Sequence, residues 1–392
     1  MKKFILISTL ILLAIFPPLS IDMYLPAFTK ITTFLHIDTN QVQFSLTIFL
    51  LGYTFAQLFF GPISDRFGRK PVLLVGTLVF IIGSISCVYS VQAWQFYLAR
   101  LIQAIGAGSG AVISLAIIRD SFEHEERLYY LGLISTVMGF APLVAPIFGG
   151  RIVQFYEWQY IFAVLAIVGI LSFILVMIID ESHKELATVS MKELYQNTAQ
   201  IISHKMFILP AVVNALAFAT MFIYISGSPH LLLGLFKITP SKFGFYFAGN
   251  ALAVIIGNFI ALRLTKIFSS EQVQLSASFL AFVGAVALIL LSHNTSNVFM
   301  VVIPMFFVTT GVGGMFPTAT GNALKAISQH IGQASALVTF IRFGSATIIT
   351  LIVAHLDFSS CQEFSMLVLI CSFTALIVSI IHVKNASALL VN

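Results

Sequence analysis

Long apolar runs separated by short polar segments recur along the whole chain. Each run holds about 20 residues, enough for an α-helix to cross the roughly 30 Å of hydrocarbon in a bilayer. Polarity does not alternate within the runs, so they lack the pattern of transmembrane β-strands. We therefore predict an all-α membrane protein with twelve transmembrane helices. The predicted spans are residues 4–28, 42–62, 71–91, 93–118, 128–152, 159–180, 206–230, 242–264, 272–292, 296–321, 331–354 and 363–383.

The composition also indicates a membrane protein. Only 9% of the residues are charged and 59% are hydrophobic, whereas a soluble protein carries about 25% charged residues. The formal net charge of +5 is spread thinly over short loops, so we expect no nucleic-acid partner. The spacing of Cys87, Cys361 and Cys371 fits neither a metal site nor a disulfide framework, and we expect no bound metal.

The distribution of lysine and arginine predicts the orientation of the chain. Two of the 20 basic residues, Arg100 and Arg342, lie within spans. If the N-terminus is cytoplasmic, fourteen of the others are cytoplasmic and only four lie outside: Lys30, Arg151, Lys237 and Lys242. Because cytoplasmic loops are enriched in Lys and Arg, we expect both termini in the cytoplasm.

The first apolar run follows Lys2 and Lys3 and so begins like a signal peptide. No small-x-small cleavage site follows it, since the sequence continues into Pro17 and Pro18. Removing the segment would also leave an odd number of spans. We expect it to be retained as the first transmembrane helix.

The longest polar interval, from Glu181 to Lys205, lies at the midpoint of the chain. It divides the spans into a six-helix bundle over residues 1–180, a cytoplasmic linker over 181–205 and a second six-helix bundle over 206–392. Residues 190–203 mix polar and apolar positions and can form either a short helix on the membrane surface or a plain linker. In two-bundle transporters, the binding site lies where the halves meet.

One segment concentrates charge between two apolar runs: residues 61–71, with the sequence GPISDRFGRKP. Charges are expensive in hydrocarbon, so this segment is predicted to be a turn in water at a membrane face. Its glycines and prolines should end one helix and begin the next. The segment resembles the G-x-x-x-D-R-x-G-R-R/K loop between helices 2 and 3 of the major facilitator superfamily, and the motif is complete here.

The superfamily resemblance implies a cytoplasmic gate role for Asp65 and Arg69. Arg119 and Asp120 are expected at the same face, where opposite charges on different loops can pair across the bundle and hold that side shut. Asp65 can also lie at the N-terminus of a helix from the other half, where the helix dipole favours an anion. The alternative is a set of solvated surface charges.

Asp22 is the only acid in the first span, within the sequence S-I-D-M-Y-L-P at residues 20–26. It can cap the helix at the outer interface, or it can face a water-filled cavity and exchange a proton near neutral pH. Its position alone does not choose between these readings. The segment is similar to the first-helix signature of the bicyclomycin/chloramphenicol resistance (Bcr/CflA) exporters, which implies that Asp22 is a candidate proton or cation site.

Arg100 lies within the fourth span and should face the bundle interior, because an arginine facing lipid is expensive. The segment R-L-I-Q-A-I-G-A-G at residues 100–108 is similar to the R-x-x-Q-G-x-G motif of superfamily helix four, with Ala104 in place of the first glycine. The resemblance links Arg100 to proton coupling, together with Asp22. The alternative is a structural bond to carbonyl groups of a neighbouring helix.

The fifth span contains the sequence A-P-L-V-A-P-I-F-G-G at residues 141–150. Two prolines four apart would bend a helix, and small residues let a neighbouring helix approach. The alternative to a functional motif is therefore an ordinary kinked helix with a packing face. The segment resembles the antiporter motif of drug:proton exporters in its Bcr-like form, which implies these motif residues: Gly139, Pro142, Pro146, Gly149 and Gly150.

Several polar residues within spans are candidates for lining a substrate cavity: Tyr24, Tyr53, Gln57, Asn250 and Arg342. Arg342 lies in the eleventh span, in a segment similar to one found in the Bcr-like exporters. It can bind an acidic group of a substrate or a partner acid within the protein. Polar groups in spans more often form bonds between helices.

The sequence carries no enzyme signature: G-x-S-x-G, H-E-x-x-H and a phosphate-binding loop are all absent. The family resemblance covers essentially the whole chain. It implies a monomeric multidrug exporter of the bacterial inner membrane that moves drug-like or amphipathic small molecules by alternating access. The proton gradient would supply the energy, without a cofactor. Two alternatives are the same fold carrying a metabolite, siderophore or sulfur compound, and a non-transporting membrane sensor or assembly factor.

Overall fold

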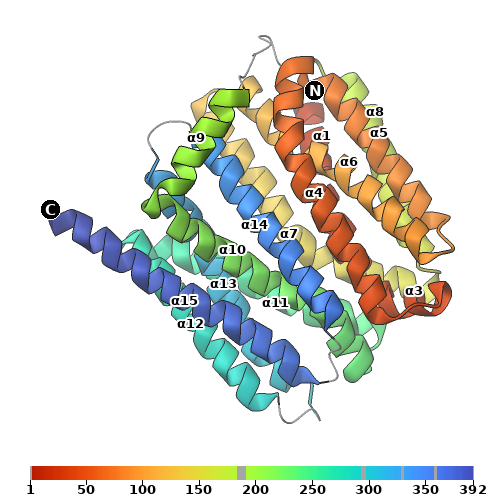
Figure 1. Ribbon diagram of the computed structural model, residues 1–392. Coiled ribbons are helices and arrows are strands. Elements are labelled where there is room, and N and C mark those ends of the chain that lie inside the picture. The colour runs from red at the N-terminus through yellow and green to blue at the C-terminus, as the bar shows by residue number, and fades with distance from the viewer. Residues whose placement is uncertain (1, 183–190, 293–296, 328–330, 357–359, 392) are drawn as a thin grey trace. The chain divides into compact units, whose positions relative to one another are not determined.

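The computed structural model describes residues 2–182, 191–292, 297–327, 331–356 and 360–391, almost all of them in helices (Figure 1). The helices are α1 (Lys2–Ala14), α2 (Phe16–Asp22), η1 (Leu25–Ala27), α3 (Phe28–Leu35), α4 (Thr39–Phe67), α5 (Arg69–Val88), α6 (Ala93–Ser121), α7 (His124–Phe155), α8 (Gln159–Ile178), α9 (Met191–Ser203), α10 (Lys205–Ser228), η2 (Pro229–Leu235), α11 (Pro240–Leu264), α12 (Ser270–Leu291), α13 (Phe299–Lys325), α14 (Ile331–His355) and α15 (Cys361–Val391).

In the described parts of the chain, twelve segments are long and apolar enough to cross a membrane, by length and composition. They are the stretch from α1 to α3, α10 continued by η2, and ten single helices: α4, α5, α6, α7, α8, α11, α12, α13, α14 and α15. Within the described residues there is no β-strand. The predicted all-α fold and the number of spans are confirmed.

The first span is not the single helix predicted over residues 4–28. It extends to Leu35 and is divided into α1, α2, η1 and α3. Proline lacks a backbone N–H and clashes with the preceding turn, so Pro17 at the start of α2 and Pro26 in η1 interrupt the hydrogen-bond ladder. Asp22 is therefore the last residue of α2, next to a break in the span.

Most of the charged segment is helical, which corrects the prediction of a turn over residues 61–71. Helix α4 continues through Pro62 to Phe67, because an interior proline removes one backbone bond without having to end a membrane helix. Only Gly68 separates α4 from α5, which begins at Arg69. Gly68 has a φ of 95°, which is in the left-handed region that favours glycine.

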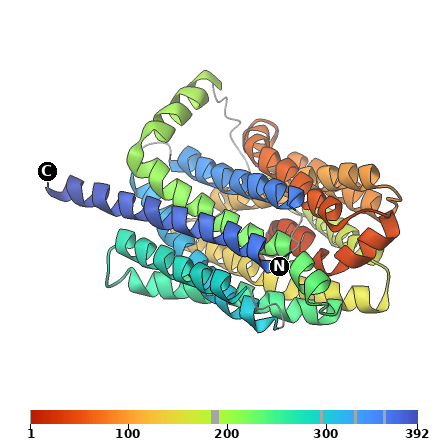
Figure 2. The ribbon, with the colours of Figure 1, turned by 60° about the horizontal axis from the view of Figure 1, so that its bottom comes forward.

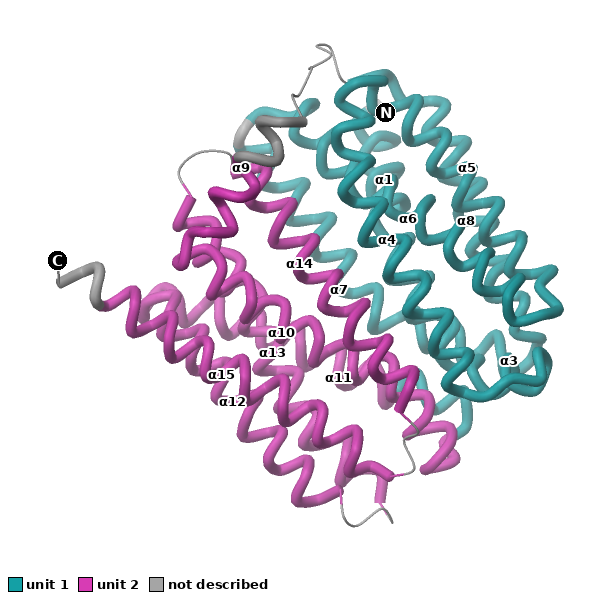
Figure 3. Tube along the Cα trace, viewed as in Figure 1, with its two compact units in different colours: residues 1–189, 239–245 teal, residues 190–238, 246–392 magenta. Residues whose placement is uncertain are grey.

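The chain divides into two compact units (Figure 3). Unit 1 comprises residues 1–189 and 239–245, and unit 2 comprises residues 190–238 and 246–392. In unit 1, α5 packs against α6 and α8, and α6 also packs against α4. In unit 2, α12 packs against α13 and α15, and Figure 2 shows the dark blue α15 running beside α12. The third, fourth and sixth spans of each half thus form corresponding groups, α5–α6–α8 and α12–α13–α15.

The core of unit 1 is built around large aromatic side chains. Phe96, Trp158 and Phe162 are fully buried and meet edge to face, with ring centroids 5.5 to 5.8 Å apart. This is the arrangement that aromatic rings prefer when they pack. The cluster joins the start of α6 to the start of α8.

The predicted linker contains a helix, α9. Its Ile201 packs in an apolar cluster with residues of α10, α13 and α14. On α14, Nε2 of Gln333 donates a hydrogen bond to Oγ1 of Thr198 at 2.7 Å. The structure therefore favours a helix that packs on unit 2 over a plain linker. Residues 183–190, which include the start of the predicted surface helix, lie outside the described residues.

Candidate functional site

Asp22 is buried in unit 1 at the C-terminal end of α2. The residue is 2% exposed, and its Oδ1 atom has no hydrogen-bond partner in the described part of the chain. An ionised carboxylate that is buried without a partner is strongly destabilised. A carboxyl group in this place therefore needs a proton or a cation as its partner. This environment suits the predicted proton or cation site, which stays a prediction.

Arg100 is also fully buried in unit 1, in a box of aromatic rings. Its guanidinium carbon lies 4.5 Å from the ring centre of Tyr24 and 4.4 Å from that of Phe49. Nη1 donates to Oε1 of Gln103 at 2.5 Å, while Nε and Nη2 have no hydrogen-bond partner among the described atoms. The rings stabilise the charge through cation–π contacts.

The two buried charged residues do not form a pair. In the described ranges, no ion pair or hydrogen bond joins Asp22 to Arg100. Tyr24, two residues after Asp22, packs against the guanidinium group. The Tyr24 segment of the broken first span therefore connects the two groups.

The antiporter motif lies on α7, which runs uninterrupted through Pro142 and Pro146. A Cβ atom at Gly149 would collide with the carbonyl oxygen of Met23, the residue after Asp22. Gly149 thus lets α7 touch the backbone at the break that carries the acid. A Cβ atom at Gly150 would collide with the carbonyl oxygen of Pro240, whereas one at Gly139 would meet no atom within 4 Å. Of the motif glycines, Gly149 and Gly150 therefore allow close packing, and Gly139 does not serve this purpose.

Three of the predicted cavity residues lie in unit 1. The hydroxyl group of Tyr24 is 3.4 Å from Oγ of Ser45, and the side chain is fully buried. On α4, Tyr53 is 2% exposed and stacks on Phe49 with ring centroids 6.3 Å apart. Gln57 follows one turn later, and its buried Nε2 has no partner in the part described. These residues extend the aromatic box along α4.

The other two predicted cavity residues lie in unit 2, Asn250 on α11 and Arg342 on α14. Asn250 donates to the hydroxyl oxygen of Tyr224 at 2.9 Å and accepts a bond from Thr309 at 3.3 Å. It therefore joins α10, α11 and α13, as polar groups in spans often do. The guanidinium group of Arg342 lies 4.9 Å from the ring centre of Phe218. The predicted cavity residues thus form separate groups in the two units.

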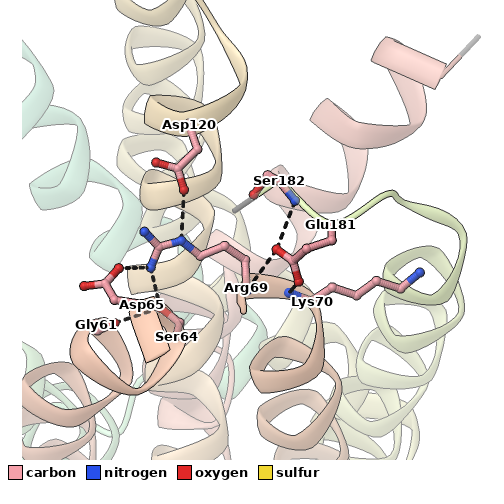
Figure 4. Close-up of polar contacts among 8 residues, drawn as sticks. All are labelled: Gly61, Ser64, Asp65, Arg69, Lys70, Asp120, Glu181 and Ser182. Atoms are coloured by element: carbon pink, nitrogen blue, oxygen red, sulfur yellow. Dashed lines mark hydrogen bonds and ion pairs between the residues drawn. The ribbon is translucent and has the colours of Figure 1, made fainter. Parts of the chain in front are cut away.

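Asp65, Arg69 and Asp120 come together in unit 1 (Figure 4). Nη1 of Arg69 lies 2.5 Å from Oδ1 of Asp65 and donates to Oγ of Ser64 at 2.6 Å. Its Nε donates to Oδ2 of Asp120 at 3.0 Å. One nearly buried guanidinium group thus joins the ends of α4, α5 and α6. Arg119, predicted for the same gate, is exposed and forms no ion pair within the described residues.

Sequence reasoning missed Glu181, which follows α8 (Figure 4). Its carboxylate accepts the backbone N–H groups of Arg69 and Lys70, both at 3.0 Å, at the N-terminus of α5. In return, Nζ of Lys70 donates to the carbonyl oxygens of Met177 and Ile179 at the end of α8, both at 2.8 Å. The two helix ends cap each other with groups that complement their dipoles. The sequence offers only a weak signal, an acid just after an apolar span.

Unit 2 also has a shallow apolar groove between α11, α12 and α13. Small residues form much of its lining, among them Gly257, Ala261, Ala277, Gly311 and Gly314. None of the predicted cavity residues lines it. The groove therefore differs from the predicted substrate cavity.

The fold and these motifs define a class of transporter, and comparison with known proteins identifies it. The chain matches the family model of the Major Facilitator Superfamily over residues 10–350 and belongs to this superfamily. It is 30% identical to a bicyclomycin resistance protein homolog of Haemophilus influenzae, over 91% of this chain and 90% of the relative. It is 27% identical to the multidrug resistance protein MdtL of Vibrio parahaemolyticus, over 86% of this chain and 85% of the relative.

Solved structures show the same fold. A D-xylose–proton symporter superimposes with a TM-score of 0.78 over 96% of this chain and 97% of the symporter, at 14% identity. A peptide transporter in complex with alafosfalin gives a TM-score of 0.79 over 97% of this chain and 94% of the transporter, at 13% identity. The predicted membership of the superfamily and the resemblance to Bcr-type drug exporters are confirmed. The chain is a multi-pass membrane protein of a transporter family.

Proposed function

We propose that this protein exports small drug-like or amphipathic molecules by alternating access, in exchange for protons. The observation that carries the proposal is the similarity to a bicyclomycin resistance protein homolog, which extends over 91% of the chain. The similarity to a multidrug resistance protein over 86% of the chain supports it. The superfamily fold alone does not define a substrate, because one fold hosts many functions.

Asp22 is the proposed proton-binding group. Its burial and its partnerless Oδ1 support this role, since a proton relieves the penalty of an isolated buried charge. Arg100 holds the aromatic box next to Asp22 through its contact with Tyr24. Gly149 brings the antiporter motif against Met23, so α7 contacts the chain where the proton binds. A proton entering from outside would bind here as substrate leaves.

The cluster of Asp65, Arg69 and Asp120 is the proposed cytoplasmic gate element. Its contacts, with Glu181 behind it, fix the ends of four helices in unit 1. In an alternating-access cycle, such a rigid end would move as one piece. Arg119 is not part of this ion-pair cluster.

The setting of the protein is proposed from the same sources. The excess of basic residues on one side supports cytoplasmic termini, and the bacterial relatives support an inner membrane. The proton gradient would be the energy source, and the protein would act as a monomer with one bundle on either side of the 181–205 linker. Small-molecule substrates, protons and lipid are the expected partners.

The test is transport by the purified protein in proteoliposomes. With a proton gradient imposed, the protein should move drug-like compounds against their own gradients, and adding those compounds should release protons. Activity restricted to metabolites, siderophores or sulfur compounds would replace the proposed substrate class. A complete absence of compound-dependent proton flux across the panel would overturn the transport proposal in favour of a membrane sensor or assembly factor.

A further inference from the structure

A layer of neutral polar side chains joins three helices near one end of unit 2. Nδ2 of Asn322 on α13 donates to Oε1 of Gln274 on α12 at 2.8 Å. Nε2 of Gln274 donates to Oγ of Ser379 on α15 at 3.4 Å. These three side chains are 0 to 4% exposed. The layer lies near the N-terminus of α12 and the C-terminus of α13.

A second layer, made of titratable side chains, lies one turn nearer that end. Each helix places one residue three positions from its member of the neutral layer: Glu271 on α12, Lys325 on α13 and His382 on α15. Residues three apart share a helix face, so the second layer stacks on the first. Nζ of Lys325 lies 3.6 Å from Oε1 of Glu271. Glu271 and His382 also interact electrostatically.

This triad occupies the same place in unit 2 as the charged cluster occupies in unit 1. Arg69 is the first residue of α5 and pairs with Asp120 near the end of α6. Glu271 is in the first turn of α12 and pairs with Lys325, the last residue of α13. The helices correspond, but the charges are reversed. The third member, which is Glu181 in unit 1, is here a histidine.

The counterpart of the charged motif therefore does not lie at the matching position in the sequence of the second half. The basic residues after the eighth span, Arg263 and Lys266, occupy the matching position in the chain but lack the glycines and the acid. The ion pair of unit 2 instead uses residues on α12 and α13 that are far apart in sequence. A pattern search misses it because the signs of the charges are exchanged.

His382 is the unusual member of the triad. It is 1% exposed, and its Nδ1 atom has no hydrogen-bond partner within the ranges described. Histidine is the side chain whose charge normally changes between about pH 5 and 8. When His382 is neutral, Glu271 pairs within the described residues with Lys325 alone, whose side chain is 77% exposed. Protonation would give Glu271 a buried cation from a third helix.

The other charged groups nearby are exposed. Helix α10 also packs against α15, and at its start it contributes Lys205, preceded by His204. Both are exposed, as is Lys384 on α15 itself. Glu271, whose side chain is 17% exposed, is therefore the partly buried acid that a protonated His382 would meet.

We propose that His382 is a proton-binding site that ties α15 to α12 through Glu271, and so strengthens this end of unit 2 at mildly acidic pH. The site is separate from Asp22 and does not depend on the transported compound. Its ligand is the proton itself, and its effect is on the packing of one bundle.

A double-mutant cycle on the purified protein tests the proposal. The melting temperature would be measured at about pH 5.5 and about pH 8, on either side of the ordinary histidine range, for the wild type, His382→Gln, Glu271→Gln and the double variant. We expect a coupling between the two positions that changes the melting temperature by about 2–4 °C at the lower pH and vanishes at the higher one. His204→Gln is the control and should leave the coupling intact.

His382→Lys separates charge from shape. A permanently charged base should couple to Glu271 at both pH values, whereas His382→Gln should couple at neither. Equal coupling in the histidine protein at both pH values, or none at either, would overturn the proposal. If His382→Gln does not fold, the Glu271→Gln variant alone tests the proposal. If the melting temperature of Glu271→Gln depends on pH in the same way as that of the wild type, the proposal is overturned.

Discussion

The proposed energy coupling depends on the carboxyl group of Asp22. It lies at the end of α2, buried, with no hydrogen-bond partner for Oδ1 in the described structure. Asparagine keeps the shape and polarity of the side chain but cannot bind a proton. Asp22→Asn should therefore reduce uphill export driven by a pH gradient to background while leaving the melting temperature nearly unchanged. Glu157→Gln, which changes an exposed acid, should transport normally. Uphill export by Asp22→Asn would show that another group couples the proton.

Arg100 tests whether the aromatic box needs a guanidinium group or only a charge. Arginine stacks on rings and donates in a fixed plane, whereas lysine is a compact, strongly hydrated charge. Arg100→Lys should lose the bond to Gln103 and part of the contact with Tyr24, which destabilises the protein by about 1–2 kcal/mol. Transport should fall as well. The measurements are thermal unfolding and initial export rate, with the exposed Arg151→Lys as the control. A Lys variant that matches the wild type in both would rule out a specific role for the guanidinium.

At this scale, the sequence reveals which residues are unusual but not what surrounds them. Asp22 and Arg100 attract attention because a charge in hydrocarbon is expensive. The box around Arg100 depends on which faces of α4 and α6 meet the broken first span, and periodicity does not define that. Glu181 gave only a weak signal because its partners are backbone N–H groups of a helix more than 100 residues earlier.

Helix α7 carries two motif glycines with opposite surroundings, which makes a matched pair of variants. A Cβ at Gly149 would collide with the backbone of Met23, and backbone cannot move aside as a flexible side chain can. Gly149→Ala should destabilise the protein by about 1–3 kcal/mol and slow export. Gly139→Ala meets no atom within 4 Å and should be neutral or stabilise the helix by up to about 1 kcal/mol. Thermal unfolding checks both. Equal effects at the two positions would contradict the packing role of Gly149.

The charged cluster gives a prediction about the ends of α4, α5 and α6. Removing Arg69 leaves Asp65 and Asp120 close to each other without the cation that joins them. Arg69→Gln should lower the free energy of unfolding by about 1–3 kcal/mol, less than for a fully buried pair because both carboxylates are partly exposed. Arg119→Gln, at an exposed position without an ion pair in the described part, should change it by at most about 0.5 kcal/mol.

A second substitution distinguishes the ion pairs from a general need for arginine at this position. Adding Asp120→Asn to Arg69→Gln removes one of the two opposed carboxylates, so it should recover part of the lost stability. The readout is again thermal unfolding of the purified protein. A double variant that loses the sum of the two single effects would show that Arg69 and Asp120 act independently.

At the scale of elements, the lengths of the apolar runs predicted every span. The places where the helices break were predicted wrongly. The first span breaks because Pro17 and Pro26 remove backbone donors within it, and a count of apolar residues does not register this. In α4 the opposite occurs, since the helix continues through Pro62 and ends only at Gly68. Proline and glycine mark places where a helix can end, and packing against neighbours decides which of them are used.

At the scale of the molecule, the two halves share an architecture that their sequences hide. The groups α5–α6–α8 and α12–α13–α15 pack alike. Each carries an ion pair between the start of its first helix and the end of its second, with opposite polarity. The two halves can keep the same helix packing while their sequences diverge, because packing tolerates many substitutions. The signs of the charges in an ion pair need not be kept, because a pair with its charges exchanged still joins the same two helix ends.

The structure sharpens the prediction that both termini are cytoplasmic. Lys or Arg occupies the last turn of α4, α6, α11 and α13, which are the second, fourth, eighth and tenth spans. Helix dipoles favour cations at any C-terminus, yet none of the spans running the other way has Lys or Arg in a described last turn. The predicted orientation would account for the difference, because bases accumulate on the cytoplasmic side.

Reporter fusions measure this orientation. Green fluorescent protein fused after Asn392 should fluoresce, and alkaline phosphatase at the same place should be inactive, because each reporter works on one side of the membrane. Alkaline phosphatase inserted at Glu157, between α7 and α8, is the matched control and should be active. Active phosphatase after Asn392 would reverse the assignment. It would also place the charged cluster of Asp65, Arg69 and Asp120 on the outer face, where it could not serve as a cytoplasmic gate.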